Sequence, residues 1–234
     1  MEKSQLNFKG VLAEVFGTLL LVLFGAGIAS RGDSLWTGSI AFGLILMGLI
    51  VILGPISGGH FNPAVSIGLL INKKIDWKNF LLYILAQFVG ATIGGALLLL
   101  IFSDAKNIGA NGLQANFTSY DATGFALIAL LVELIATFVF VLTIILTVSD
   151  EKLSKWAVFI IPSALTLALL MAGAFTGGSV NPARSFGTMI YSDLIKDVWV
   201  VIVGPVVGAV LAGLAGMCLL KNKQKEQVSE ETAH

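Results

Sequence analysis

Two stretches of the chain decide its fold: GPISGGHFNPAVS at residues 54–66 and FTGGSVNPARSFG at residues 175–187. The first lies within residues 34–72, which contain no Asp, Glu, Lys or Arg. As one helix, that run would be roughly 58 Å long, whereas the hydrocarbon core of a bilayer is about 30 Å thick. Glycine and proline break the run between Gly54 and Pro63. We therefore expect a full-length helix followed by a half-length helix.

The second stretch repeats the first at a constant distance. Glu14, Thr18, Gly58, Gly59 and the triplet Asn62-Pro63-Ala64 each have an identical counterpart 119 residues later. The counterparts are Glu133, Thr137, Gly177, Gly178 and Asn181-Pro182-Ala183. This offset indicates a tandem duplication, with repeats at about residues 8–103 and 122–220. Because each repeat holds three expected spans, an odd number, the second repeat enters the membrane from the opposite side. Paired interrupted segments in an inverted repeat point to a substrate path near the bilayer midplane.

The composition is that of an integral membrane protein. Of the 234 residues, 56% are hydrophobic and 12% are charged, whereas a soluble domain carries about 25% charged residues. Six stretches with at most one charge are long enough to hold a spanning helix of about 20 residues. They are residues 10–30, 34–72, 79–103, 122–149, 156–192 and 198–220. The predicted fold class is an all-α membrane protein with six transmembrane helices plus two re-entrant half-helices in an inverted repeat.

Charge and motif content exclude several functions. The 14 basic and 14 acidic residues balance, and no basic patch lies outside short loops, so no nucleic-acid partner is expected. No G-x-x-x-x-G-K-[ST] sequence is present, which argues against transport driven by ATP. The single cysteine, Cys218, excludes an internal disulfide and a cysteine metal cluster. No pattern of catalytic groups or metal ligands is apparent, so we expect neither an enzyme nor a metal site.

Lysines are concentrated in segments that the expected topology places on one side. Cytoplasmic loops of membrane proteins carry an excess of Lys and Arg. Ten lysines fall at the termini, after the second span and after the fourth: Lys3, Lys9, Lys73, Lys74, Lys78, Lys152, Lys155, Lys221, Lys223 and Lys225. The opposite loops carry only Arg31, Lys106 and Lys196 as basic residues. We therefore expect a multi-pass protein of the cell membrane with cytoplasmic N- and C-termini, and a solvated tail without a fold of its own at residues 221–234.

Each Asn-Pro-Ala box has the chemistry of a helix start. Asparagine caps a helix, proline suits the first turn and alanine continues it. In an inverted repeat, helices starting at Pro63-Ala64 and Pro182-Ala183 point their N-termini at each other, each with about half a positive charge, and so repel cations. Asn62 and Asn181 can cap through their oxygens and offer their amide NH2 groups to a passing neutral molecule. The loop residues expected beside this path are Gly58, Gly59, His60, Gly177 and Gly178.

With these residues, the chain resembles the aquaporin and glycerol facilitator family. The resemblance rests on SGGHFNPAVS, GGSVNPARSFG, AEVFGT in the first span and the 119-residue duplication, and it covers about residues 8–220. It implies an aquaporin-like fold, with residues 1–234 forming a single transmembrane channel domain. It also implies a pore in every protomer, a homotetramer in the lipid bilayer and no cofactor.

The resemblance further implies a narrow extracellular constriction. Counting from the boxes places its four positions at Phe42, Leu169, Gly178 and Arg184. Arg184 should face the pore, because an unpaired arginine in a span costs about 2.5–3.5 kcal/mol. Water-selective members generally have a histidine where Leu169 stands, and Gly178 has no side chain, so we expect a wider ring. An apolar wall of Phe42 and Leu169 opposite the donor Arg184 suits a polyol.

These features predict a passive channel for glycerol, water and other small uncharged solutes, including urea, hydrogen peroxide and lactic acid, that excludes protons and ions. Some residues favour a different selectivity, and their indications are mixed. Ser185 and Met189 stand where glycerol facilitators usually have Asp and a basic residue, and they resemble the water-channel branch. Val201 and Ile202 replace an aromatic pair common in water channels. A water-selective aquaporin is the first alternative, and a proton-coupled secondary transporter is the second.

Glu14 and Glu133 are isolated carboxylates in apolar spans, and such residues indicate function by default. One interpretation is proton coupling. The family resemblance implies another, in which each carboxylate accepts backbone N–H groups of the adjacent box loop. We favour this loop-bracing role, because the carboxylates are duplicated together with the loops.

Two further patterns have alternative interpretations. His60 is either a pH gate or a loop residue with satisfied hydrogen bonds, and we favour the second. The small-residue patterns that start at Gly90 and Gly204 allow close helix approach, which predicts packing between the halves.

Overall fold

The computed structural model describes residues 6–31, 34–105, 108–114 and 121–231, with side chains described up to residue 222. Six helices in this part are long and apolar enough to cross a membrane. The first consists of α1 (Phe8–Leu20), a π-helical segment η1 (Leu21–Ala26) and α2 (Gly27–Ala29). The others are α3 (Leu35–Ser57), α5 (Trp77–Phe102), α6 (Ala122–Val148), α8 (Ala157–Thr176) and α10 (Val198–Glu231). The six predicted spans are confirmed, and the short elements α7 (Glu151–Ser154) and η3 (Asp193–Asp197) lie in connections.

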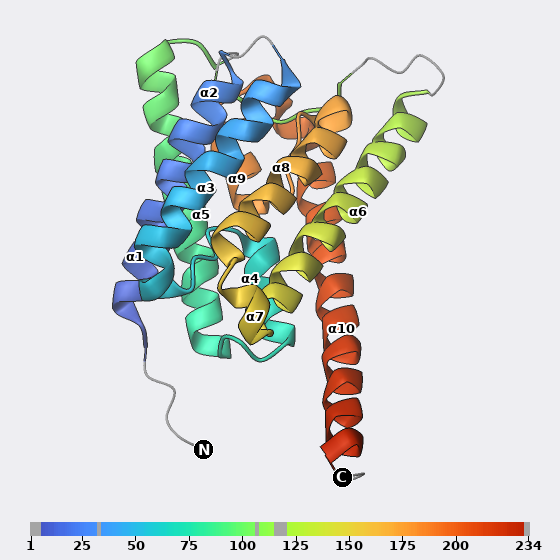
Figure 1. Cartoon of the computed structure of the whole chain (residues 1–234). Coiled ribbons are helices and arrows are strands. Elements are labelled where there is room, and N and C mark those ends of the chain that lie inside the picture. Colours follow the sequence, from blue (N-terminus) through green and yellow to red (C-terminus); the bar gives the residue numbers. More distant parts are fainter. Residues whose placement is uncertain (1–5, 32–33, 106–107, 115–120, 232–234) are drawn as a thin grey trace.

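Two half-length helices, α4 (Pro63–Ile71) and α9 (Pro182–Met189), start at the Asn-Pro-Ala boxes. At about 1.5 Å per residue, neither reaches half of the ~30 Å bilayer core. Figure 1 shows α4 in the lower half of the molecule and α9 in the upper half, and it shows that α1 begins and α10 ends at the lower end. The predicted pair of re-entrant half-helices is therefore present.

Local sequence explains why each full helix stops before its half-helix. Gly58 caps the C-terminus of α3 and Gly177 that of α8, and both glycines have left-handed backbone conformations, with φ of 89° and 79°. Glycine adopts this conformation without a steric penalty. The next helix then starts with an asparagine N-cap and a proline in its first turn.

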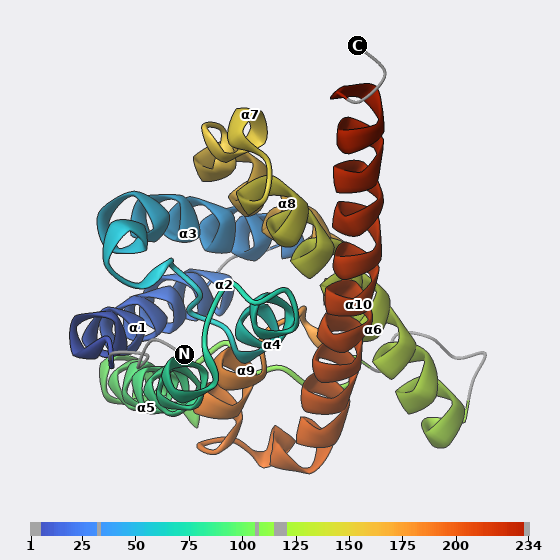
Figure 2. The same ribbon diagram turned by 90° about the horizontal axis from the view of Figure 1, so that it is seen from below.

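The two halves of the chain interlock through the half-helices. Within each half, the first span packs against the third, α1 on α5 and α6 on α10, while α3 and α8 pack across the halves. In the same way, α9 packs against α5, and α4 packs against α10. Figure 2 shows α4 and α9 surrounded by the longer helices. The halves differ at η1, because α6 is α-helical throughout.

The glycines of the small-residue patterns face helices of their own half, whereas Ala91 and Thr92 within the first pattern contact Gly187 and Tyr191, so that pattern also packs between the halves. A side chain at Gly90 would overlap the Val15 carbonyl of α1, and one at Gly208 would overlap the Leu134 carbonyl of α6. The direction in which each glycine faces depends on helix rotation, which the spacing alone does not reveal. The halves are also in close contact where Gly95 of α5 meets Gly187 of α9.

Gly95→Ala is expected to destabilise the protein strongly. Its new methyl group would overlap the Gly187 carbonyl oxygen, a backbone atom that can move only if α9 moves. Overpacking of this kind costs about 1–3 kcal/mol or more. Gly48→Ala is the matched control, because no described residue outside its own helix backbone comes within 4 Å of an added methyl group there. Thermal unfolding in detergent should show a lower transition for Gly95→Ala alone; equal transitions for the two variants would contradict the contact.

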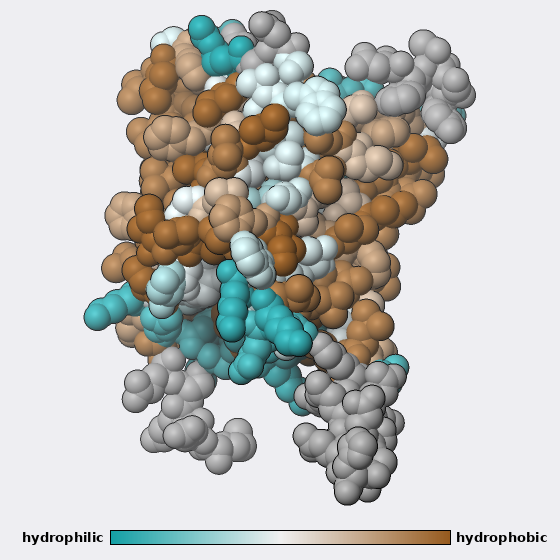
Figure 3. All heavy atoms as spheres, in the orientation of Figure 1, coloured by the Kyte–Doolittle hydropathy of each residue, from teal (hydrophilic) through white to brown (hydrophobic). Residues whose placement is uncertain are grey.

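The surface divides into an apolar belt and two polar ends. Figure 3 shows hydrophobic residues over the sides of the molecule and a hydrophilic group at its lower end. Exposed tryptophans lie near the ends of spans: Trp36 and Trp199 near the upper end, and Trp77 and Trp156 near the lower end. Tryptophan is typical of membrane–water interfaces. The distribution is that of a multi-pass membrane protein.

The segment after Lys221 differs from the expectation that it has no fold of its own. α10 continues as a helix to Glu231. Residues 221–231 contain neither glycine nor proline and are rich in Lys, Gln and Glu, which are good helix formers. The helix of the last span therefore extends beyond the apolar segment.

Candidate functional site

The two Asn-Pro-Ala boxes are joined by a reciprocal pair of hydrogen bonds. Nδ2 of Asn62 donates to the carbonyl oxygen of Val180 at 2.8 Å, and Nδ2 of Asn181 donates to the carbonyl oxygen of Phe61 at 3.0 Å. Each bond links a residue of one repeat to a residue of the other. The N-termini of α4 and α9 are therefore held next to each other in the interior.

The oxygen of each asparagine caps its own half-helix. Oδ1 of Asn62 accepts from the backbone N–H of Ala64 at 2.8 Å, and Oδ1 of Asn181 accepts from that of Arg184 at 3.1 Å. An amide NH2 group has two N–H donors, and the bond between the loops uses one of them. The other N–H of each asparagine is left for the cavity that both residues line.

The residues just before the asparagines have unusual backbone conformations. Phe61 and Val180 have φ of 48° and 47°, a left-handed conformation that is costly for residues with a branched or bulky side chain. The carbonyl groups of Val180 and Phe61 accept hydrogen bonds from Asn62 and Asn181, respectively, and these bonds help to hold the left-handed conformation. The matched conformations show that the duplication extends to the backbone of the loops.

Glu14 of α1 binds the first box loop. It is fully buried, and it accepts hydrogen bonds from Ser57 Oγ at 2.7 Å, from the backbone N–H groups of His60 and Phe61 at 3.0 and 2.6 Å, and from Gln87 Nε2 at 2.8 Å. The carboxylate therefore has a donor for each of its main lone-pair directions.

Glu133 of α6 binds the second box loop in the same way. It accepts from Thr176 Oγ1 and from the backbone N–H groups of Ser179 and Val180, at 2.8 and 2.9 Å. Neither Glu14 nor Glu133 lines the cavity between the boxes. In both halves the carboxylate satisfies two consecutive backbone N–H groups that no helix or strand would satisfy.

A narrow cavity passes the two boxes. It has a volume of about 20 Å³, room for about one water molecule. Its lining residues are Leu21, Phe42, Leu46, His60, Asn62, Phe140, Leu165, Leu169, Ser179, Asn181 and Arg184. Most of this wall is apolar, and the polar groups that interrupt it come mainly from the box loops and Arg184.

The four residues expected at the constriction lie together where this cavity meets an outer depression of about 300 Å³. Phe42 and Leu169 line both spaces, Arg184 lines the inner one and Gly178 lines the outer one. Cζ of Arg184 lies 4.8 Å from the centre of the Phe42 ring, over its face. The arrangement places a guanidinium group and an apolar wall at one narrow point.

The glycines of the box loops are needed for the backbone conformation of the turns. Gly178 has φ of 74°, and a Cβ there would lie 3.0 Å from the Leu169 carbonyl oxygen. Glycine is thus required by the turn and by the close approach of Leu169. Gly177 lines the outer depression. Gly58 and Gly59, in contrast to the expectation, are not among the residues that line the cavity, because they form the turn that ends α3.

Arg184 is held by a residue that the sequence did not suggest. Its Nη1 donates to Oδ1 of Asn111, which also accepts from Ser185 Oγ at 2.7 Å. Asn111 lies between α5 and α6, and its Nδ2 donates to the carbonyl oxygens of Thr176 and Gly178 at 3.2 and 3.0 Å. Nε of Arg184 is buried without a hydrogen-bond partner among the described residues. No motif marks Asn111, because all of these partners lie far along the chain.

His60 forms a hydrogen-bonded pair within its loop. Its Nδ1 lies 2.9 Å from Ser66 Oγ, which also accepts from Gln87 Nε2 at 2.9 Å. The second repeat has the same arrangement with different residues, since Ser179 Oγ lies 2.6 Å from Ser185 Oγ. His60 therefore has a side-chain partner and also lines the cavity. Among the described residues, no three His, Cys, Asp or Glu side chains are grouped to hold a metal ion.

Six spans, two facing half-helices and a narrow passage between them define a membrane channel. A family profile described as Major intrinsic protein matches residues 1–215. The chain is 40% identical over 222 residues to Aquaporin-5 of Mus musculus, covering 91% of this chain and 81% of that protein. It is 37% identical over 206 residues to Glycerol uptake facilitator protein-like 6 of Lactiplantibacillus plantarum, covering 86% and 93%.

Solved structures agree with these similarities. The aquaglyceroporin from Plasmodium falciparum matches with a TM-score of 0.73 at 26% sequence identity, over 89% of this chain and 94% of that one. The chain therefore belongs to the major intrinsic protein family, whose members are channels and not enzymes. The predicted resemblance is confirmed.

Proposed function

We propose that this protein is a passive channel for glycerol, water and other small uncharged solutes, among them urea, hydrogen peroxide and lactic acid, and that it excludes protons and ions. The observation that carries the proposal is the mixed lining of the cavity at the constriction. The charged Arg184 lines it beside the apolar Phe42, whose ring the guanidinium covers, and the apolar Leu169. A polyol has hydroxyl groups for the polar part of this lining and CH groups for the apolar part.

The roles of the site residues follow from the same geometry. The remaining N–H groups of Asn62 and Asn181 donate to the solute as it passes the boxes. The facing N-termini of α4 and α9 and the charge of Arg184 oppose the entry of cations. Glu14 and Glu133 brace the loops, and neither carboxylate lines the cavity, which speaks against a part in proton coupling.

A water-selective channel is the second candidate, and the volume of the cavity favours it. Room for about one water molecule suits a file of water. Leu169 argues in the other direction, because it supplies no second polar contact opposite Arg184.

Stopped-flow light scattering on proteoliposomes separates the two candidates. In a glycerol gradient, we expect protein-containing vesicles to shrink and then to re-swell much faster than protein-free vesicles, whereas sorbitol should give no re-swelling. Fast shrinkage without glycerol re-swelling would leave the water-selective candidate. A pH gradient should not drive glycerol uphill; accumulation against its gradient would contradict a passive channel.

Leu169→His is expected to reduce glycerol flux more than water flux. The imidazole replaces part of the apolar wall and adds a polar group opposite Arg184. The ratio of glycerol to water permeability should therefore fall about tenfold, which is a typical effect of reshaping an apolar pocket. Leu169→Met is the matched control, since it keeps an apolar side chain of similar volume. Substituting Gly178 would be a poorer test, because its positive φ and its contact with Leu169 oppose any side chain.

We further propose that the chain forms a homotetramer in the cell membrane with cytoplasmic termini. The tetramer is a general feature of the family, and the orientation rests on the lysines at the lower end of the molecule. Native mass spectrometry would test the first statement. Labelling of Cys218, which is exposed near that end of α10, in intact and permeabilised cells would test the second.

A further inference from the structure

A pocket separate from the solute passage lies at the lower end of the molecule. It has a volume of about 1060 Å³ and is formed by the end of α4, the connection from α6 to α7 and the last turns of α10 before Lys221. None of its lining residues lines the cavity at the Asn-Pro-Ala boxes. Figure 2 shows this end of the molecule, with α4, α7 and α10 in view.

The pocket is basic. Lys73, Lys74, Lys152 and Lys221 line it, against two acidic residues, Asp150 and Glu151. Oδ1 of Asp150 already accepts from the backbone N–H groups of Lys152 and Leu153, where it caps α7. The lysines come from three segments of the chain, so the excess of positive charge is a property of the fold.

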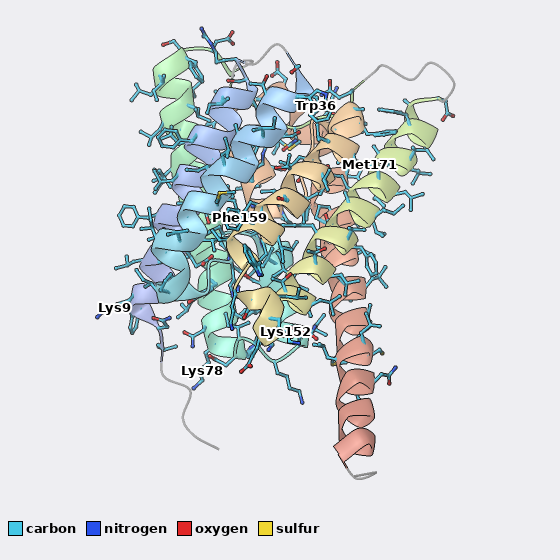
Figure 4. All side chains as sticks on the ribbon, in the orientation of Figure 1. Lys9, Trp36, Lys78, Lys152, Phe159 and Met171 are labelled. Carbon is cyan, nitrogen blue, oxygen red and sulfur yellow. The ribbon has the colours of Figure 1, made fainter. Side chains whose placement is uncertain are left out.

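The pocket lies at the level of the membrane that lipid headgroups occupy. Trp77 and Trp156 are exposed near the same end, and tryptophan at a span end marks the headgroup level. Trp77 follows Lys73 and Lys74 by about one helical turn of sequence, and Trp156 follows Lys152 in the same way. Figure 4 shows Lys152 on α7 at this end, and Figure 3 shows the hydrophilic group there.

Part of the lining is apolar. Ile71, Met217 and Leu220 face the pocket together with the lysines. A free anion would gain nothing from these side chains, whereas a phospholipid would place its phosphate among the lysines and the start of its acyl chains on the apolar part.

We propose that this pocket binds the headgroup of an anionic phospholipid in the leaflet that faces the lower end of the protein. Basic pockets between helices at a membrane surface are suited to such headgroups, and each lysine near an anionic surface strengthens the attraction. The lipid would bridge α4, α7 and α10, which belong to different repeats. The proposal does not depend on which solute the passage conducts.

Native mass spectrometry of delipidated full-length protein tests the proposal with phosphatidylglycerol and phosphatidylcholine of identical acyl chains. Wild-type protein should retain phosphatidylglycerol in preference to phosphatidylcholine. The variant Lys73→Gln, Lys74→Gln, Lys152→Gln should weaken phosphatidylglycerol binding about tenfold to a hundredfold. The matched control is Lys9→Gln, Lys78→Gln, Lys155→Gln, which removes the same charge at the same end outside the pocket; Figure 4 shows Lys9 and Lys78 away from Lys152.

Cys218 gives a second, local readout. It is the single cysteine of the chain and lines the pocket, so a bound headgroup should slow its alkylation by a maleimide. Phosphatidylglycerol should protect Cys218 in wild-type and control protein, but not in the pocket variant. Equal binding by the pocket and control variants would overturn the proposal. Equal protection by inorganic phosphate alone would overturn the assignment to a lipid, because the anion would then suffice.

Discussion

Glu133→Leu is expected to prevent stable folding of the protein. The change leaves the backbone N–H groups of Ser179 and Val180 without an acceptor in the interior, while Thr176 keeps a bond to the Ala172 carbonyl. Two buried donors without partners cost about 2–6 kcal/mol, a large share of the about 5–15 kcal/mol that stabilises a typical protein. Fluorescence-detected size-exclusion chromatography of heated, detergent-solubilised samples measures the loss.

Two further variants sharpen this result. Glu133→Gln keeps one oxygen but turns an NH2 group toward one of the two N–H donors, so its stability should fall between wild type and Glu133→Leu. Glu14→Leu removes an acceptor that serves four donors, and its effect should equal or exceed that of Glu133→Leu. Glu151→Gln, at an exposed residue of α7, is the control and should change little. A stable Glu133→Leu protein with normal flux would refute the loop-bracing role.

Asn111→Ala is expected to reduce glycerol and water permeability together. Without the Oδ1 that accepts from its Nη1, the Arg184 side chain is no longer held against the wall of a cavity with room for about one water molecule. A hydrogen bond to a charged group contributes about 1.5–3 kcal/mol, so permeability should fall about tenfold as the arginine enters the passage. Stopped-flow measurement on proteoliposomes with equal amounts of reconstituted protein tests this.

Asn111→Asp distinguishes the role of the Oδ1 acceptor from that of the Nδ2 donor. It keeps an oxygen for Arg184 and loses the Nδ2 donor to the carbonyls of Thr176 and Gly178. We expect permeability close to wild type, with some loss of stability. If Asn111→Asp conducts as poorly as Asn111→Ala, the bond to Arg184 is not what sets the flux.

The fold could be predicted from sequence because its signals are local and repeated. Charge-free runs longer than a bilayer must break, and the Asn-Pro-Ala boxes show where each half-helix starts. The 119-residue offset then implies that Asn62 and Asn181 meet, and the structure brings them together. These inferences needed only helix geometry, capping chemistry and counting.

The rest depends on contacts that no local pattern reveals. Asn111 binds Arg184 and Thr176 from a connection without a repeat or motif. The contact of Gly95 with Gly187 depends on how α5 and α9 are rotated, which spacing does not specify. Likewise, whether Gly58 reaches the cavity depends on the turn it forms. Sequence reasoning thus located the candidate site and the carboxylates that bind its loops, but not the contacts made by Asn111, Gly95 and Gly58.

The reciprocal hydrogen bonds, from Asn62 to Val180 and from Asn181 to Phe61, have a consequence for synthesis on the ribosome. The first box is made 119 residues before its partner, which at about 5–20 residues per second is a delay of about 6 to 24 seconds. During that interval Asn62 lacks the carbonyl to which it finally donates, and α4 lacks α10. The early half of a nascent chain must therefore wait in the insertion machinery, or in a looser arrangement in the bilayer, until translation delivers the half that completes it.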